Sequence, residues 1–285
     1  MDQFDKQLQQ TVPEFDEDSG VAKNSEFDLS SSMKAVQIHG VKQILGIIAV
    51  AVVIIGLWEL LIRLYNVPQF VLPTPSAIVA ALVRSLPTIW PHFLITLAEL
   101  ASGYVIGVIA GLLLAGVVTQ FPYIEKIITP YILLLVVTPA MALVPLLMMR
   151  FGFTIFPRII AIALASGPMV MINSTTGFRR TDLAKIALAK SYGASTFQIF
   201  RKIRFPLALP MINVGLLVGG IFGLITAIGA DMVGGKNGLG NRLSYYSSLG
   251  RMAEFFAVII LVALIGILLW IGITKLGNKY ASWKE

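Results

Sequence analysis

The sequence carries little charge for its length. Asp, Glu, Lys and Arg make up 13% of its 285 residues, whereas 56% are hydrophobic. A soluble domain has about 25% charged residues, because it needs polar groups to cover its surface. The shortage excludes an ordinary soluble protein and predicts that much of the surface faces lipid.

Cysteine is absent and histidine is scarce. Without cysteine the chain can form no disulfide, no thiol nucleophile and no zinc–thiolate site. The only histidines are His39 and His92. We therefore expect no metal site.

The sequence also lacks the loop with which ATPases hold phosphates. That loop needs Gly, four residues, Gly-Lys and then Ser or Thr. The nearest stretch, residues 229–237, has its first glycine one position out of register and Asn237 in place of the hydroxyl residue. No nucleophile and base stand together either. We predict that the chain is not an enzyme and binds no cofactor itself.

The first 30 residues are acidic and polar. They hold eight Asp or Glu against Lys6 and Lys23, and few large apolar residues. Such a composition is typical of disorder, and it differs from a signal peptide, which has a basic start and an apolar core. We divide the chain into a disordered acidic cytoplasmic tail, 1–40, and a single transmembrane domain, 41–285. The tail is either a solvated segment or a regulatory or partner-binding arm.

Long apolar runs dominate the rest of the chain. A membrane-spanning helix needs roughly 20 mostly apolar residues. We predict an all-α polytopic membrane protein with about six transmembrane helices, of which the third and fourth are interrupted by proline. The predicted spans are 44–62, 95–118, 127–149, 159–176, 209–230 and 255–276.

The distribution of Lys and Arg predicts the orientation. These residues gather in the cytoplasmic loops of membrane proteins. With the N-terminus inside, the inner segments hold 13 of them beyond the two in the tail, and the outer segments hold 7. The N- and C-termini and the loop 177–206 are therefore predicted to be cytoplasmic.

The segment after the first span contains Pro73 and Pro75, which hold the chain extended. Ser76 would then cap a short helix, 77–83, on the outer membrane surface.

Two predicted spans carry glycines four residues apart. Such glycines lie on one helix face and let a second helix approach closely. For the first set we expect ordinary packing, and for the second set either a dimer seam or a moving contact. The two sets are Gly103, Gly107 and Gly111, and Gly215, Gly219 and Gly223.

Three carboxylates lie in or near the spans, where ionisable groups mark functional sites. Glu59 stands four residues before Arg63, so a helical ion pair can neutralise it. Glu99 and Asp231 remain candidates for contact with substrate or for gating.

The loop 177–206 is too polar to span the membrane and is regularly patterned. Thr181 or Asp182 can cap a first helix, 183–192, and Gly193 can end it in a left-handed conformation.

A second helix in this loop begins with Ser195 and Gln198 at capping-box spacing. Phe197, Phe200 and Ile203 share one face of this helix, and a proline at 206 would stop it. From the residues alone, the loop is either a docking element or a basic amphipathic hairpin on anionic lipid.

The spacing of the loop resembles a known family. Ala187-Leu-Ala189, three residues, Gly193, nine residues and Ile203-Arg-Phe-Pro206 are similar to the "EAA" loop of ABC importer permeases. The family has Glu-Ala-Ala at the start and Ile-x-Leu-Pro at the end. Here alanine replaces the glutamate, which removes a salt link, and phenylalanine replaces the leucine.

Other segments resemble the nitrate/sulfonate/taurine subfamily of these permeases. They are 72–76, 150–152 and 238–240, and the resemblance covers roughly residues 44–280. Where the subfamily often has Arg after the outer amphipathic helix, this chain has Glu99.

The resemblance implies the type I ABC importer permease fold in the bacterial cytoplasmic (inner) membrane. It implies four kinds of partner besides lipid: a second copy of the chain, two cytoplasmic ATPase subunits, the ATP and Mg they hold, and an extracytoplasmic substrate-binding protein. No nucleic acid is expected. The implied ATPase-coupling residues are Ala187, Leu188, Ala189, Gly193, Ala194, Ser195, Phe197, Phe200, Ile203 and Pro206.

The resemblance also implies import of a small polar or anionic solute, such as a sulfonate, nitrate, taurine or a carboxylate, with a thiamine-precursor pyrimidine as the alternative. The path would follow the two-fold axis of a homodimer. A gradient-driven secondary transporter or channel is the rival function, although no inverted repeat is evident. The polar residues expected to line the path are Asn173, Ser174, Thr226, Asp231 and Glu99, while Asn213 could equally form a helix–helix hydrogen bond.

Overall fold

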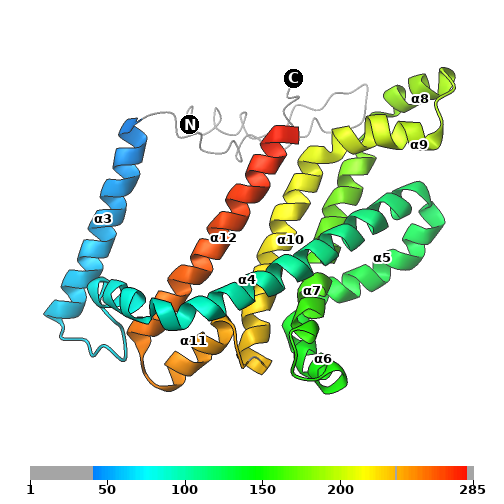
Figure 1. The fold of residues 1–285 in the computed structure, drawn as a ribbon. Coiled ribbons are helices and arrows are strands. Elements are labelled where there is room, and N and C mark those ends of the chain that lie inside the picture. The colour runs from blue at the N-terminus through cyan, green and yellow to red at the C-terminus, as the bar shows by residue number, and fades with distance from the viewer. Residues whose placement is uncertain (1–40, 235, 281–285) are drawn as a thin grey trace, which may run out of the picture. The chain divides into compact units, whose positions relative to one another are not determined.

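The computed structural model describes residues 41–234 and 236–280, so the predicted tail lies outside the described residues. All regular structure within these ranges is helical, which confirms the predicted all-α fold (Figure 1). The longer helices are α3 (Val41–Leu64), α4 (Pro75–Gln120), α5 (Pro122–Val137), α7 (Phe156–Arg179), α10 (Phe205–Gly234) and α12 (Met252–Tyr280). The shorter ones are η1 (Ala140–Leu143), α6 (Val144–Phe151), α8 (Leu183–Ser191), α9 (Thr196–Ile199), η2 (Phe200–Arg204) and α11 (Leu239–Ser248).

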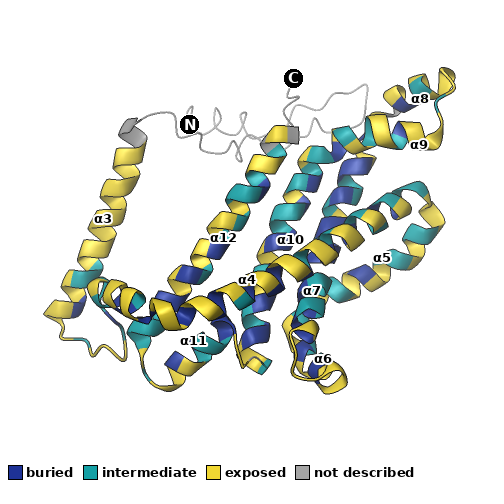
Figure 2. Ribbon diagram, in the orientation of Figure 1, coloured by how far each residue is buried: buried dark blue, intermediate teal, exposed yellow. Residues whose placement is uncertain are grey.

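The prediction of about six spans is confirmed. Five helical segments of the described chain are long and apolar enough to cross a membrane, and a bent helix pair makes a sixth if it counts as one span. The chain forms two units, of which the first ends at Leu57 and the second begins at Trp58. In the first unit, residues 44–57 of α3 are exposed on all sides (Figure 2).

Helix α4 joins two elements that the sequence predicted to be separate. Its 46 residues extend roughly 69 Å, about twice the thickness of the hydrocarbon core, which is more than one upright span needs. The expected short helix, 77–83, is the first part of α4. The predicted cap is wrong, because Thr74 caps α4 by accepting from the N–H of Ala77. Ser76 instead donates its N–H and hydroxyl to Glu59, at 3.0 and 2.7 Å.

The third predicted span is broken in the structure. Helix α5 ends at Val137, and η1 and α6 continue at an angle of 86° to it. Thr138 is extended, as expected for a residue before proline, and Pro139 then has no N–H to continue the ladder. The proline positions predicted an interruption here, but the size of the bend depends on packing.

Helix α7 is the centre of the second unit. Its contacts with α4 and with α10 are the two most extensive helix–helix contacts among the described residues. On α4, Gly103, Gly107 and Gly111 all face α7. A Cβ atom on Gly103 would lie 2.7 Å from both the carbonyl oxygen of Ile159 and the Cβ of Ile162. The missing side chains thus allow the two backbones to approach each other closely.

The glycines of α10 also face α7, and they meet Ile162, Ser166 and Val170, which the glycines of α4 contact too. A Cβ on Gly215 would come within 2.9 Å of Asn173, and one on Gly219 within 2.9 Å of Val170. Gly223 lies against Ile162 with ordinary spacing. Because α7 fills this face, no room remains there for a second copy of the chain.

A tightly packed glycine and an open one predict opposite effects of adding one methyl group. In Gly103→Ala the new Cβ would overlap α7, and overpacking of this kind costs about 1–3 kcal/mol. In the control Gly272→Ala, on α12, a Cβ meets no atom within 4 Å, and alanine favours a helix by up to about 1 kcal/mol over glycine. Thermal unfolding of the purified protein should show a lower Tm for the first variant and an unchanged or higher Tm for the second. Equal Tm values would contradict the close packing.

Candidate functional site

The loop between α7 and α10 forms α8 and α9 at one end of the helices (Figure 1). Asp182 caps α8 by accepting from the N–H of Ala184 at 2.8 Å. Gly193 ends the helix in the left-handed region, with a φ of 76°, and donates to the carbonyl of Lys190. Ser195 and Gln198 form a complete capping box at the start of α9. The local geometry predicted for these turns is confirmed.

The second helix of the loop does not stop at Pro206 as predicted. It runs without a break through η2 into α10. Within η2 the N–H of Phe205 bonds to the carbonyl of Phe200, five residues back. This wider π-turn makes room for the proline ring, which would clash with the carbonyl four residues back in an ordinary α-helix.

The loop presents apolar side chains on its outside. Leu188, Tyr192 and Phe197 are 60%, 84% and 70% exposed, and we call these three residues the exposed loop surface. Ile186 and Ile199 point inward and are buried. Of the other residues implied by the resemblance, Ala187 and Ser195 are exposed, while Ala189, Ala194, Ile203 and Pro206 are half-buried.

The loop is also basic. Arg179 forms an ion pair with Glu125 of α5. The other basic residues of the loop precede, separate or follow the residues of the exposed loop surface in the sequence. They are Arg180, Lys185, Lys190, Arg201, Lys202 and Arg204.

An apolar groove of about 850 Å³ lies between the loop and the end of α4. Phe197, Phe200 and Phe205 form one wall, and Phe200 packs 5.0 Å from the ring of Phe178. The predicted face is therefore divided. Phe197 is open to a partner, whereas Phe200 joins the loop to α7.

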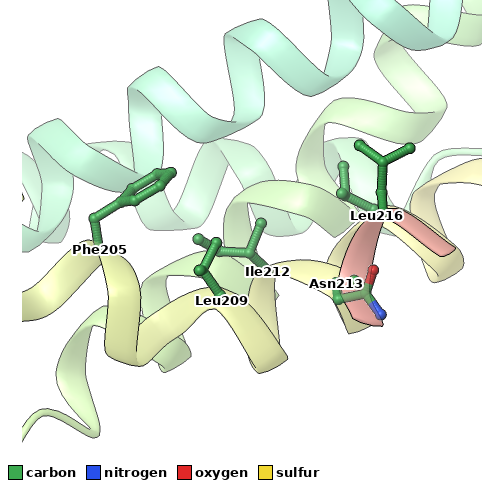
Figure 3. A pocket seen from close by; sticks show the side chains of 7 residues that line it. Phe205, Leu209, Ile212, Asn213 and Leu216 are labelled. Atoms are coloured by element: carbon green, nitrogen blue, oxygen red, sulfur yellow. The ribbon is translucent and has the colours of Figure 1, made fainter. Parts of the chain in front are cut away.

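A smaller apolar pocket of about 260 Å³ lies along α10 (Figure 3). The labelled side chains come from one helix, and Asn213 supplies the polar group among them. Its Oδ1 atom is buried without a hydrogen-bond partner among the described residues. Gly277 on α12 approaches this amide so closely that a Cβ there would overlap it.

A buried charge cluster lies at the other end of α7 and α10. Arg158, near the start of α7, places its Nη1 atom 2.8 Å from Oε1 of Glu99 and 2.8 Å from Oδ1 of Asp231. Both carboxylates are fully buried. We call these three residues the charge triad. It joins α4, α7 and α10, because each helix supplies one member.

The turn between α10 and α11 closes over the charge triad. Thr96 donates to Oδ2 of Asp231 at 2.6 Å and accepts from the N–H of Leu239 at 2.8 Å. His92 accepts from the N–H of Gly238 at 3.0 Å. Gly238 has a φ of 103°, and a Cβ there would overlap the Asp231 carboxylate, so only glycine fits.

The other predicted path residues lie nearer the middle of α7 and α10. Ser174 and Thr226 are buried inside the chain, and Asn173 is half-buried and donates to the carbonyl of Met169. Their role in a path stays a prediction. The fold brings Glu99 and Asp231 together at Arg158, near the start of α7. Asn173 and Ser174 lie on a later part of α7, away from this cluster.

Sequence reasoning missed three members of this network: Arg158, Thr96 and His92. The predicted fourth span, 159–176, begins one residue after Arg158 and so leaves it in the loop before the span. The available signal was the presence of unpaired acids in the predicted spans, since an intramembrane carboxylate needs a partner.

Comparison with known proteins identifies relatives over most of the chain. A probable ABC transporter permease protein of Haemophilus influenzae is 26% identical over 80% of this chain and 93% of its own length. The formylaminopyrimidine transport permease protein ThiX of Halalkalibacterium halodurans is 27% identical over 80% and 92%. A putative aliphatic sulfonates transport permease protein SsuC of Bacillus subtilis is 28% identical over 82% and 85%.

Among solved structures, the MetNI methionine ABC transporter in an inward-facing conformation has a chain similar to this one. It aligns with a TM-score of 0.55 and 20% identity, over 71% of this chain and 97% of that chain. At this identity the match shows similarity of fold only, and it agrees with the predicted type I importer permease fold.

The family model described as "Binding-protein-dependent transport system inner membrane component" matches residues 103–279. This match includes the loop between α7 and α10 and both α7 and α10 themselves. The chain belongs to this family, the membrane-spanning permease subunits of ABC importers.

Proposed function

We propose that two copies of this chain form the path of an importer for a small polar or anionic solute. Two separate ATPase subunits bind ATP and Mg²⁺ and dock on the loop between α7 and α10. A substrate-binding protein delivers the solute at the other side. A closed two-fold assembly is the usual arrangement for identical subunits.

The observation that carries this proposal is the exposed loop surface. Large apolar side chains rarely stand so far into solvent without a partner, and here basic residues surround them. Caps at both helices hold them rigidly, so little conformational entropy is lost on binding. These features favour docking into a groove of another protein over contact with lipid headgroups.

The orientation follows from the same surface. The basic residues of the loop favour the cytoplasmic side, where positively charged loops accumulate. The charge triad, at the other end of α7 and α10, would then lie toward the outer face. Both termini are cytoplasmic in this arrangement.

The path residues fit a moving assembly. We place Asn173, Ser174 and Thr226 along it, because they are polar and lie on the two helices that flank the docking loop. ATP-driven movement of the loops would shift α7 and α10 as rigid bodies and open the path to one side at a time. The burial of Ser174 and Thr226 is consistent with a closed state.

The rival function, a gradient-driven transporter or channel, is less well supported. It would use Glu99 and Asp231 as ion ligands, but both lie 2.8 Å from the same Arg158 nitrogen. A guanidinium in this position occupies the place that a cation would take.

The relatives named for aliphatic sulfonates and formylaminopyrimidine support a small polar solute. Sulfonate, nitrate, taurine and carboxylates share a compact anionic group, and the pyrimidine remains the alternative. Calorimetric titration of the substrate-binding protein that copurifies with the assembled permease, with one compound of each class, distinguishes them.

Phe197→Asp tests the docking of the ATPase. The substitution places a charge in an apolar contact, and we expect loss of copurification with the co-expressed ATPase and at least a tenfold drop in ATPase activity. The side chain is 70% exposed, so the Tm of the permease should not change. Phe153→Asp, also exposed at 75%, is the control and should copurify normally. Loss of liposome binding with intact copurification would contradict docking and favour the lipid hairpin.

Gly193 provides a second test through the backbone. A Cβ there meets no atom within 4 Å, so only the φ of 76° limits the choice of residue. Gly193→Asn should retain most of the ATP-dependent uptake, because asparagine tolerates this conformation, whereas Gly193→Val should lose it. Uptake assayed in proteoliposomes with the whole complex measures both variants. Equal activity of the two would show that this turn does not position the loop.

A further inference from the structure

The charge triad does not balance its own charge. Two carboxylates face one guanidinium, and all three side chains are buried in a chain that spans the membrane. An uncompensated charge in such surroundings costs several kcal/mol. A further positive charge or a bound proton must therefore complete the site.

The neighbouring groups do not supply that charge. His92 accepts a hydrogen bond from Gly238 through Nδ1, which requires a free lone pair and therefore a neutral imidazole. Arg242 of α11 lies with its guanidinium 5.2 Å from the ring centre of Tyr245. Within the described residues Arg158 is the one cation that forms an ion pair with either acid of the triad.

The two carboxyl groups have different surroundings. Asp231 accepts hydrogen bonds from Thr96 at 2.6 Å and from Arg158 at 2.8 Å, as an ionised carboxylate requires. Glu99 lies near the same Arg158 nitrogen, but no donor in the described ranges is aligned to bond to either of its oxygens. A fully buried carboxylate without donors is the less stable of the two.

We infer that Glu99 is a proton-binding site and carries one proton in the folded permease. Its carboxylic acid makes the charge triad neutral as a whole. Glu99 and Asp231 both lie 2.8 Å from the same nitrogen, so one guanidinium faces two carboxyl groups, and ionising both would leave a net negative charge buried. The hydroxyl of Glu99 can then donate to Asp231, which joins α4 to α10 through the proton.

Infrared spectroscopy tests this on the unsubstituted chain. The assembled permease in lipid, labelled with ¹³C at the carboxyl groups of glutamate, should show one C=O stretching band of a protonated carboxyl group that moves with the label. Glu99→Gln should lose this band. Glu59→Gln is the control and should keep the band. Glu59 accepts hydrogen bonds from Arg63 and Ser76, as an ionised carboxylate does, so it does not contribute to the band. Absence of the band, or a shift with labelled aspartate instead, would overturn the inference.

Stability supplies a second measurement. Glutamine reproduces the neutral, donating form of Glu99, so Glu99→Gln should leave Tm within about 2 °C of the unsubstituted protein. Asp231→Asn removes the charge that Arg158 and Thr96 bind, and should lower Tm by about 5 °C or more. A loss of Tm in Glu99→Gln as large as that in Asp231→Asn would mean that Glu99 is ionised, and would refute the assignment.

Discussion

The close approach of α7 to α4 and α10 is the constraint on which the second unit depends. Glycines at four-residue spacing on both outer helices remove the side chains that would hold the backbones apart. This distance brings Arg158 of α7 within 2.8 Å of an acid from each neighbour. The charge triad is therefore a consequence of helix packing, and it fixes the three helices at one end.

The other end of α7 and α10 carries the loop. Because α8 and α9 are joined covalently to both helices, a force on the exposed loop surface passes directly to α7 and α10. The π-turn of η2 keeps the second helix continuous through Pro206, and Phe200 packs on Phe178. The proposed ATPase contact and the charge triad thus act on the same pair of rigid helices.

Local geometry was predictable where neighbouring residues decide it. The Asp182 cap, the left-handed Gly193 and the capping box at Ser195 all depend on residues within one turn of each other. The errors arose where a local signal met a larger context. Pro206 did not end its helix because a π-turn accommodated the ring. Ser76 did not cap α4 because the helix begins one residue earlier, at Pro75, and the N–H and hydroxyl of Ser76 bond to Glu59, 17 residues away.

By itself, the sequence determined the apolar spans, the polar loop with its turns, and the resemblance to importer permeases, since these depend on composition and short spacing. It also identified two acids in or near the spans, Glu99 and Asp231. Only the tertiary structure decided their partner, because Arg158 is 59 residues from Glu99 and 73 residues from Asp231 along the chain. No periodicity links such distant positions. They meet because the glycine faces of α4 and α10 both pack closely on α7, within reach of one guanidinium.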